Sequence, residues 1–339
     1  MNSELKLQLR AIQALRRHLP AHLWHQMGNL IADDRAKQEA HLRKPDSEID
    51  KTLFGKLDAF NASGFMQLPL SLEPDLVDSI RNHLELNPVF DGSHIFSSNS
   101  IIPTPLSKAR TEFSMAGYHM DQIIRTPGVV DIFNHPAIID FLELYFGCVP
   151  TLYSLASWWA FPGDKPEKLN VQHFHRDVDD WKFCTVFLYL TDVDEDSGPH
   201  QVIPGSHRKE MMELLLKRAA SRGANISNFD IEKSFVSYFG EEFSRQCEEL
   251  FGDDIKSVTG PRGTLSLVNT VNIHRGLLPK KSERLLIWAR YGLGPNINSS
   301  NLEQGPIGRD IVPANLTDSP RNRYVNRLLM KFDHRLYLD

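Results

Sequence analysis

The sequence predicts an all-β core, built as a sandwich or barrel and flanked by N-terminal helices. From residue 151 onward, short runs of aromatic, β-branched and apolar residues recur, and Gly or Pro turn signals separate most of them. Residues 1–150 instead have mainly helix-like and loop-like patterns. Their clearest helix covers 136–146, opened by Asn134 and Pro136 and closed by Gly147. The strands that we expect are 151–159, 182–190, 200–204, 263–269 and 284–292.

A helical segment interrupts these expected strands. The stretches 207–218 and 241–250 both have helical patterns. We therefore expect 208–255 to be an insertion between two strands, which either shapes a substrate pocket or has a purely structural role. The predicted organisation is a helical region at 1–150 packed on the barrel, a β core at 151–295 and a C-terminal extension at 296–339.

Composition is that of an ordinary globular protein and argues against two classes of partner. Hydrophobic residues make up 41% of the chain and charged residues 24%. The formal net charge of −5 does not indicate a basic surface that would bind nucleic acid. No stretch approaches the roughly 18 apolar residues of a membrane span. The three cysteines form no Cys-x-x-Cys motif, which fits a reducing compartment. We expect a cytoplasmic protein whose partner is a small molecule.

The most informative motif is the triplet His175-Arg176-Asp177, which a single His274 complements much later in the chain. Two histidines and one carboxylate can bind one face of a metal ion and leave the other face open. That arrangement suits Fe(II), which must bind a chelating cosubstrate and O2 together. Arg284 follows His274 by ten positions and offers a planar fork for a second carboxylate. The pattern predicts an iron- and 2-oxoglutarate-dependent oxygenase, with His175, Asp177 and His274 as metal ligands.

Two other His-x-acid triplets compete with this one. His83-Leu84-Glu85 lies in a helix-like stretch, where side chains two residues apart diverge by about 200° and cannot share a metal. A strand instead points residues two apart to one face, and the apolar run 183–190 after His175 supplies that context. No equivalent strand follows His119-Met120-Asp121, which we interpret as a polar pair in an irregular segment.

Other residues compete for roles near the metal. Arg290 shares a strand face with Arg284, but its later position would place it further along the barrel, so we favour Arg284 as the carboxylate anchor. His173 is expected to support the metal ligands from behind or to pack, and His207 is expected to cap local backbone groups. The aromatic residues near the triplet either contact a substrate or form core: Trp158, Trp159, Phe174 and Trp181.

Three ordered blocks around these residues resemble the phytanoyl-CoA dioxygenase superfamily of Fe(II)/2-oxoglutarate-dependent oxygenases. The first block is Gln172-His173-Phe174-His175-Arg176-Asp177. The second runs from Tyr189 through Ser197-Gly198-Pro199 to Ile203-Pro204-Gly205-Ser206-His207. The third leads from Gly260-Pro261-Arg262-Gly263-Thr264 to His274-Arg275-Gly276. The resemblance covers somewhat under half of the chain.

The resemblance implies a double-stranded β-helix, a jelly-roll, cupin-like barrel whose interior holds the metal. It also implies 2-oxoglutarate and O2 as cosubstrates, and hydroxylation of an unactivated C–H bond in a small-molecule or lipid- or sugar-linked metabolite. Halogenases that resemble this family replace the metal-binding carboxylate with a small residue, so Asp177 favours hydroxylation.

Two other classes of function stay open. A cupin-like metal-dependent isomerase or hydrolase could use two histidines and one aspartate on a similar barrel, but it would have no need of Arg284. A non-catalytic binding module could keep the barrel and its polar residues without turnover.

Overall fold

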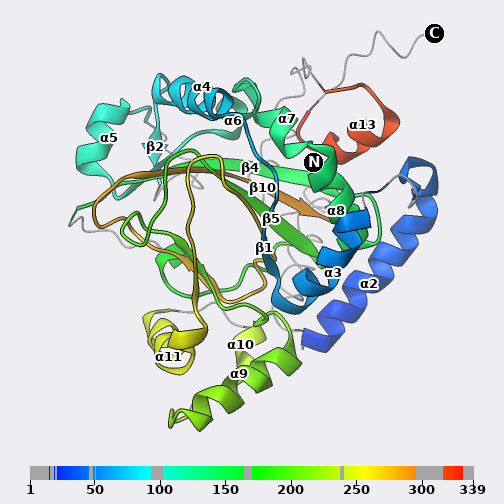
Figure 1. Ribbon diagram of the computed structural model, residues 1–339, viewed down its shortest axis with the longest axis vertical. Coiled ribbons are helices and arrows are strands. Elements are labelled where there is room, and N and C mark those ends of the chain that lie inside the picture. Colours follow the sequence, from blue (N-terminus) through cyan, green and yellow to red (C-terminus); the bar gives the residue numbers. More distant parts are fainter. Residues whose placement is uncertain are drawn as a thin grey trace.

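A large antiparallel β-sheet forms the centre of the fold (Figure 1). The computed structural model describes residues 21–45, 51–92, 102–163, 170–236, 240–294 and 316–330, together with residues 15, 19 and 49. The seven strands of this sheet follow the order β1 (Phe65–Gln67), β8 (Leu265–Val268), β5 (Phe183–Tyr189), β10 (Arg284–Gly292), β4 (Thr151–Ala160), β3 (Met115–Gly117) and β2 (Phe90–Asp91).

A smaller antiparallel sheet completes the barrel. Its strands follow the order β7 (Lys256–Val258), β6 (His200–Val202) and β9 (His274–Gly276). An antiparallel bridge between His175 and His274 adds the segment after η3 (Asn170–Gln172) beside β9. Along the chain, β4 of the large sheet is followed by this segment of the small sheet and then by β5 of the large sheet. Strands β6 and β7 belong to the small sheet, β8 to the large, β9 to the small and β10 to the large. This alternation between two sheets is that of a jelly roll, so the predicted barrel with helical additions is confirmed.

The strands β5 and β10 have an outer and an inner face, because side chains alternate along a strand. Val186 and Ile287 point outward and belong to the main hydrophobic core. Phe187, Leu286 and Trp288 point the other way and line a cavity inside the barrel. The inner residues therefore supply the walls of the site described below.

Helices cover the outer face of the large sheet (Figure 1). Among them, α6 and α13 contact β4, and α3 contacts α8. These helices are α2 (Ala21–Gln38), η1 (Ala40–Leu42), α3 (Lys51–Ser63), α4 (Pro74–Glu85), α5 (Leu106–Glu112), α6 (Met120–Arg125), α7 (Val129–Phe133), α8 (Pro136–Phe146) and α13 (Pro320–Asn326).

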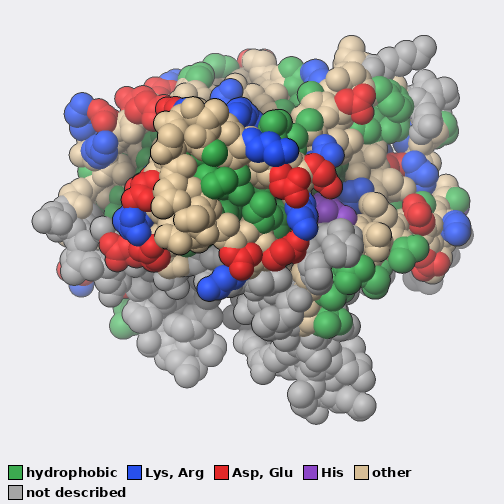
Figure 2. Space-filling model, turned by 90° about the horizontal axis from the view of Figure 1, so that it is seen from below, with side chains coloured by type: hydrophobic (Ala, Val, Ile, Leu, Met, Phe, Trp, Pro, Cys, Tyr) green, Lys and Arg blue, Asp and Glu red, His purple; other side chains and the backbone are tan. Residues whose placement is uncertain are grey.

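The helices between β6 and β7 form a second core on the other side of the barrel. They are α9 (Lys209–Ser221), α10 (Lys233–Val236), α11 (Glu241–Phe251) and η4 (Gly252–Asp254). Their apolar side chains pack with Phe174 and Ile273, the residues directly before His175 and His274. Figure 2 shows acidic and basic side chains mixed with some hydrophobic ones on the face that is seen from below. Ion pairs such as Arg218–Asp254 occur on these helices.

Most expected elements occur within a few residues of their predicted bounds. The helix expected at 136–146 is α8, and Gly147 closes it with a φ of 81°. Its N-cap is His135 rather than Asn134, because the His135 ring accepts a hydrogen bond from the Ala137 N–H. The predicted strand at 284–292 is β10, and the predicted helix around His83 is α4.

Two sequence-based expectations need correction or addition. The segment at His119 is not irregular: His119 is the N-cap of α6, where its side chain and that of Gln122 form a capping box. The short strands β1, β2, β3, β7 and β9 were not predicted. Each has only two or three residues and depends on partners that are distant in the chain.

The division into 1–150, 151–295 and 296–339 stays a prediction. Within the last of these ranges, the structure describes residues 316–330, and residues 296–315 and 331–339 lie outside the described parts. None of the described helices combines the length and the apolar character needed to cross a membrane.

Gly198 is a position where only glycine fits, and its replacement tests the packing of the loops around β9. Its φ is 70°, and a Cβ there would lie 2.5 Å from the Leu277 carbonyl oxygen. We expect Gly198→Ala to lower the free energy of unfolding by about 3 kcal/mol or more, because backbone strain adds to a clash. Gly147→Ala is the matched control, since its φ is 81° but no atom of the described residues lies within 4 Å of the added Cβ. It should cost about 1 kcal/mol in urea unfolding, and equal losses would contradict the clash.

Candidate active site

His175 and His274 are cross-strand neighbours in the small sheet. The backbone N–H of each donates to the carbonyl of the other, with both N–O distances at 2.9 Å. Their ring centroids are 4.3 Å apart. An antiparallel pair places its two side chains on the same face of the sheet. The fold therefore brings together two histidines that are far apart in the sequence.

Hydrogen bonds at Nδ1 orient both rings. The Nδ1 of His175 lies 2.8 Å from the His173 carbonyl oxygen, and the Nδ1 of His274 lies 2.9 Å from the Asn272 carbonyl oxygen. A carbonyl can only accept a hydrogen bond, so each Nδ1 carries a proton. Each Nε2 then keeps its lone pair, as a metal ligand requires. Burial is the main cause that lowers the pKa of His274 to about 3, which keeps its ring neutral.

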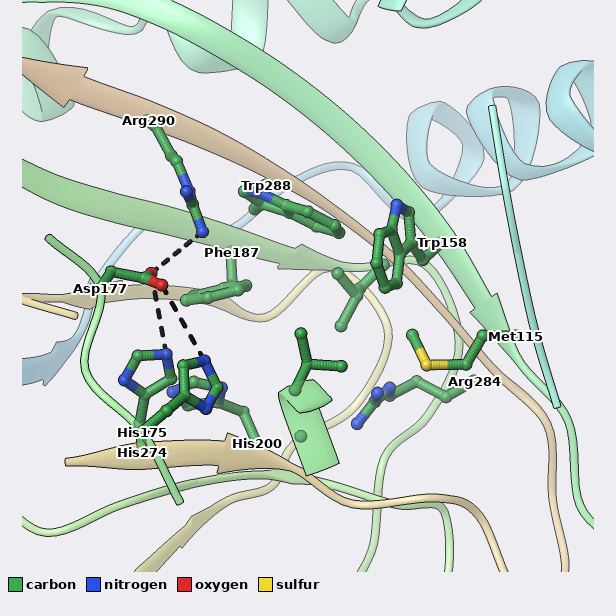
Figure 3. Close-up of a pocket in the computed structure, with 13 residues that line it drawn as sticks. Met115, Trp158, His175, Asp177, Phe187, His200, His274, Arg284, Trp288 and Arg290 are labelled. Atoms are coloured by element: carbon green, nitrogen blue, oxygen red, sulfur yellow. Dashed lines mark hydrogen bonds and ion pairs between the residues drawn. The ribbon is translucent and has the colours of Figure 1, made fainter. Parts of the chain in front are cut away.

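Asp177 joins the two histidines in one cluster (Figure 3). Its Oδ1 is 3.9 Å from the Nε2 of His175, and its Oδ2 is 3.7 Å from the Nε2 of His274. The backbone N–H of Asp177 donates to the Thr270 carbonyl at 2.9 Å. Burial would raise the pKa of the carboxyl, but Arg290 and the two histidines outweigh it and lower the pKa to about 2. The carboxylate is therefore ionised at neutral pH.

The donor set fits a divalent metal such as Fe(II). One potential ligand atom from each of His175, Asp177 and His274 lies within 4.8 Å of the others. Ligand atoms about 2.1 Å from a metal and roughly at right angles are about 3 Å apart, so binding requires the ligand atoms to close by less than about 2 Å. Two neutral imidazoles and one carboxylate are also the facial set of non-haem iron oxygenases. The assignment of these three residues as metal ligands stays a prediction.

Arg290 holds Asp177 from the side opposite the histidines (Figure 3). Its Nη2 donates to Asp177 Oδ2 at 3.0 Å, and its Nη1 donates to Asp179. The Tyr153 hydroxyl donates to the same Asp179 oxygen at 3.2 Å. Both terminal nitrogens of Arg290 are thus engaged by carboxylates. This pairing makes Arg290 a poor candidate for the anchor of a further carboxylate and leaves Arg284 as the better one.

A cavity of about 140 Å³ extends from the three-residue cluster to Arg284, at the start of β10. Arg284 is only 5% exposed, and its Nε and Nη1 have no hydrogen-bond partner among the described residues. Burial lowers the pKa of Arg284, but a guanidinium keeps its proton in proteins. A buried cation without an anion is destabilising, so this end of the cavity suits an anionic group. The apolar walls consist of Met115, Trp158, Val171, Phe187, Leu286 and Trp288.

Sequence reasoning missed one polar residue of this cavity, His200 at the start of β6. It is 7% exposed, it lines the cavity, and its Nε2 has no hydrogen-bond partner among the described residues. No acidic residue follows it at the spacing of a chelating pair. One signal was available, because the expected strand at 200–204 begins at this histidine.

The remaining candidates have structural positions. Of the four aromatic residues near the triplet, Trp158 lines the cavity, whereas Trp159 and Phe174 lie in hydrophobic cores. The fourth, Trp181, is partly buried and packs against two hydrophobic clusters. The ring nitrogens of His207 contact Asn272 and a backbone carbonyl outside the cavity.

The inserted helices do not shape the cavity within the described part of 208–255, since none of those residues lines it. Of the two roles that the sequence left open, the described residues support the structural one. Their core packs behind the strands that carry the histidines.

The barrel and its buried cluster of two histidines and one aspartate define a candidate metal-dependent enzyme of the jelly-roll class. The model of the phytanoyl-CoA dioxygenase (PhyH) family matches residues 119–237, about a third of the chain. The predicted resemblance to this superfamily is thereby confirmed for a segment that contains His175 and Asp177. His274 and Arg284 lie beyond the matched residues. No curated protein matches the sequence.

Several solved structures align with most of this chain. EctD from S. alaskensis with bound Fe shares 15% identity, with 86% of this chain and 90% of that chain covered and a TM-score of 0.47. HygX from Streptomyces hygroscopicus, with nickel, 2-oxoglutarate and hygromycin B bound, shares 15% identity over 72% and 87% of the chains, with a TM-score of 0.44. The carbocyclase SnoK from nogalamycin biosynthesis shares 14% over 81% and 96%, with a TM-score of 0.44. At these values the likeness assigns no ligand or reaction to this chain.

Replacement of Arg290 should reveal the buried charges that it compensates. We expect Arg290→Met to lower the free energy of unfolding of metal-free protein by about 3 to 5 kcal/mol, because Asp177 and Asp179 lose their shared cation. Added Ni(II) should reduce this loss, since a bound divalent ion compensates Asp177. Urea unfolding with a chelator and with Ni(II) measures both effects. Arg262→Met breaks an exposed pair with Asp78 and should cost less than about 1 kcal/mol. A similarly small loss for Arg290→Met would contradict the expected role.

Proposed function

We propose that this protein is an Fe(II)/2-oxoglutarate-dependent dioxygenase that hydroxylates an unactivated C–H bond of a small-molecule substrate. His175, Asp177 and His274 would hold the iron, and Arg284 would hold the distal carboxylate of 2-oxoglutarate. Iron bound there would supply O2 activation coupled to the decarboxylation of 2-oxoglutarate to succinate and CO2. The family match at 119–237 and the placement of these four residues around one cavity support the proposal.

Arg284 is the feature on which the proposal rests. The other arginines at this depth are held by acceptors of the chain: Arg290 pairs with Asp177 and Asp179, and Arg176 donates to three backbone carbonyl oxygens. Arg284 has no such partner among the described residues, although it shares the cavity with a potential metal site. A metal-dependent isomerase or hydrolase that acts on an uncharged substrate would leave this cation uncompensated. A dicarboxylate with one end at the metal and the other at Arg284 compensates it.

The chain's own contribution is to orient the cosubstrate and to exclude water. A guanidinium can bind a carboxylate with two parallel hydrogen bonds, so Arg284 would fix the orientation of 2-oxoglutarate in the cavity. Trp158 and Trp288 both line the cavity and pack edge to face, with ring centroids 5.3 Å apart. With Phe187 they form an apolar surface beside the potential metal site, which would keep bulk water from the reacting groups.

The same walls suggest what the substrate brings to the site. The charged groups of the cavity are already committed, because Arg290 pairs with two aspartates and Arg284 would bind the cosubstrate. The space that remains is bordered by Met115, Trp158 and Trp288. We therefore propose that the part of the substrate that reacts is uncharged and apolar, whatever polar groups the rest of the metabolite carries.

Anaerobic titration of Fe(II)-loaded protein with 2-oxoglutarate tests the proposed cosubstrate site. The wild-type protein should develop the visible metal-to-ligand charge-transfer band of an iron-bound 2-oxo acid. Asp177→Ala should abolish the band, because a metal ligand is lost. Arg284→Met should raise the Kd at least about 30-fold, since a buried pair between charged groups contributes about 2 to 5 kcal/mol.

Arg275→Met is the matched control for Arg284→Met. Arg275 lies on β9 next to His274, but it points away from the cavity and pairs with Glu248. The Kd of this variant should equal that of the wild type. A folded, iron-loaded wild-type protein without a band would contradict the proposal and favour an isomerase, a hydrolase or a binding module.

Hydroxylation is tested on a substrate found by screening metabolites that contain an uncharged, apolar part for release of succinate. In an atmosphere of ¹⁸O2, the product should gain one ¹⁸O atom, which mass spectrometry detects. Stoichiometric succinate with no ¹⁸O in the product would show an oxidation of another kind, such as ring closure or epimerisation. That result would overturn hydroxylation and leave the cosubstrate site intact.

A further inference from the structure

His200 and Arg284 border the same open space beside Gly276. In the small sheet, His200 of β6 pairs directly with Gly276 of β9. A Cβ built on Gly276 would lie 3.9 Å from the Nη2 of Arg284. Because Gly276 has no side chain, this space stays open between the guanidinium and the residue that pairs with the glycine. All three residues line the cavity.

The pairing of β6 with β9 points His200 into the barrel. Val202 pairs with His274, and residues two apart on a strand share a face, so His200 lies on the same face as His274. Its ring lies between two others, with centroid distances of 4.9 Å to Phe187 and 5.2 Å to His274. These contacts hold the imidazole within the cavity.

His200 has unused hydrogen-bonding capacity at this place. Its Nε2 has no partner among the described residues, and the side chain is buried in the barrel. A neutral imidazole can donate one hydrogen bond. A buried polar group without a partner is unfavourable, and the same holds for the Nε and Nη1 of Arg284. One anion between the two side chains would satisfy both.

We propose that His200 donates a hydrogen bond to the distal carboxylate of the 2-oxo acid cosubstrate, so that His200 and Arg284 recognise this group together. This inference rests on the proposed function and adds a specificity residue to it. Arg284 supplies the positive charge and His200 supplies a directed donor from the neighbouring strand. The pair selects 2-oxo acids that carry a second carboxylate.

A different role for His200 would be to support His274 by ring packing alone. In that case its loss would weaken the metal site and every 2-oxo acid equally. If His200 contacts the distal carboxylate, its loss weakens only those oxo acids that have one. Two cosubstrates of equal chain length therefore separate these roles: 2-oxoglutarate and 2-oxopentanoate, which lacks the distal carboxylate.

The experiment is an anaerobic titration of Fe(II)-loaded wild type and His200→Leu with each of these two oxo acids. The charge-transfer band gives the Kd, and a separate assay gives the bound iron. We expect the Kd of His200→Leu for 2-oxoglutarate to rise about tenfold, as for loss of one hydrogen bond to a charged group. The Kd for 2-oxopentanoate should change less than about twofold. His200→Gln keeps an N–H near the Nε2 position and should recover most of the lost affinity.

Gln201→Leu is the control, because Gln201 is the next residue of β6 and contacts Arg275 and Ser257 outside the cavity. It should behave like the wild type. An unchanged Kd for 2-oxoglutarate in His200→Leu, or an equal rise for both oxo acids, would overturn the inference. If His200→Leu does not fold, a His200→Met variant is tested by the same ratio of Kd values. A wild type with no band for either oxo acid would instead overturn the proposed function, and this inference with it.

Discussion

The backbone pairing of His175 with His274 is the constraint on which the rest of the site depends. Side chains alternate along a strand, so the bridge that turns these histidines inward turns Phe174 and Ile273 outward. Those two residues belong to the core of the inserted helices. A slip of one residue would exchange the faces and place apolar side chains where the polar cluster lies. The insert therefore stabilises the register of the site, although its described residues do not line the cavity.

Charge balance in the buried interior is the second constraint. Asp177 and Asp179 carry two negative charges, and Arg284 and Arg290 carry two positive charges, so the group is neutral as a whole. Its charges are unevenly placed, however, because Arg290 pairs with both aspartates, whereas Arg284 pairs with no acidic residue in the described part of the chain. A divalent metal would add two positive charges and a dicarboxylate would remove them. Each ligand then lowers the electrostatic cost of binding the other, since the interior screens charges weakly.

The parts of the fold that could be predicted from sequence are those with local signals. The apolar alternation of β4 and β10 and the turn at Gly147 are visible within about ten residues, and the structure has these elements where they were expected. Strand β9 has three residues and exists because it pairs with β6 and with His175, both distant in sequence. The same reason hid His200. Its place in the cavity comes from the pairing with Gly276, which no spacing in the sequence encodes.

Arg284 and Arg290 show the same limit within one strand. Both occupy the inner face of β10, six residues and about 20 Å of strand apart, and strand alternation cannot separate their roles. Their surroundings do. The loop that follows His175 brings Asp177 and Asp179 to Arg290, whereas Gly276 leaves space at Arg284. One arginine therefore has its anions from the chain itself, and the other faces a cavity that can admit one. The binding capacity of Arg284 arises because the described residues offer it no anion and Gly276 beside it has no side chain. Both facts can be seen only when the strands are placed side by side.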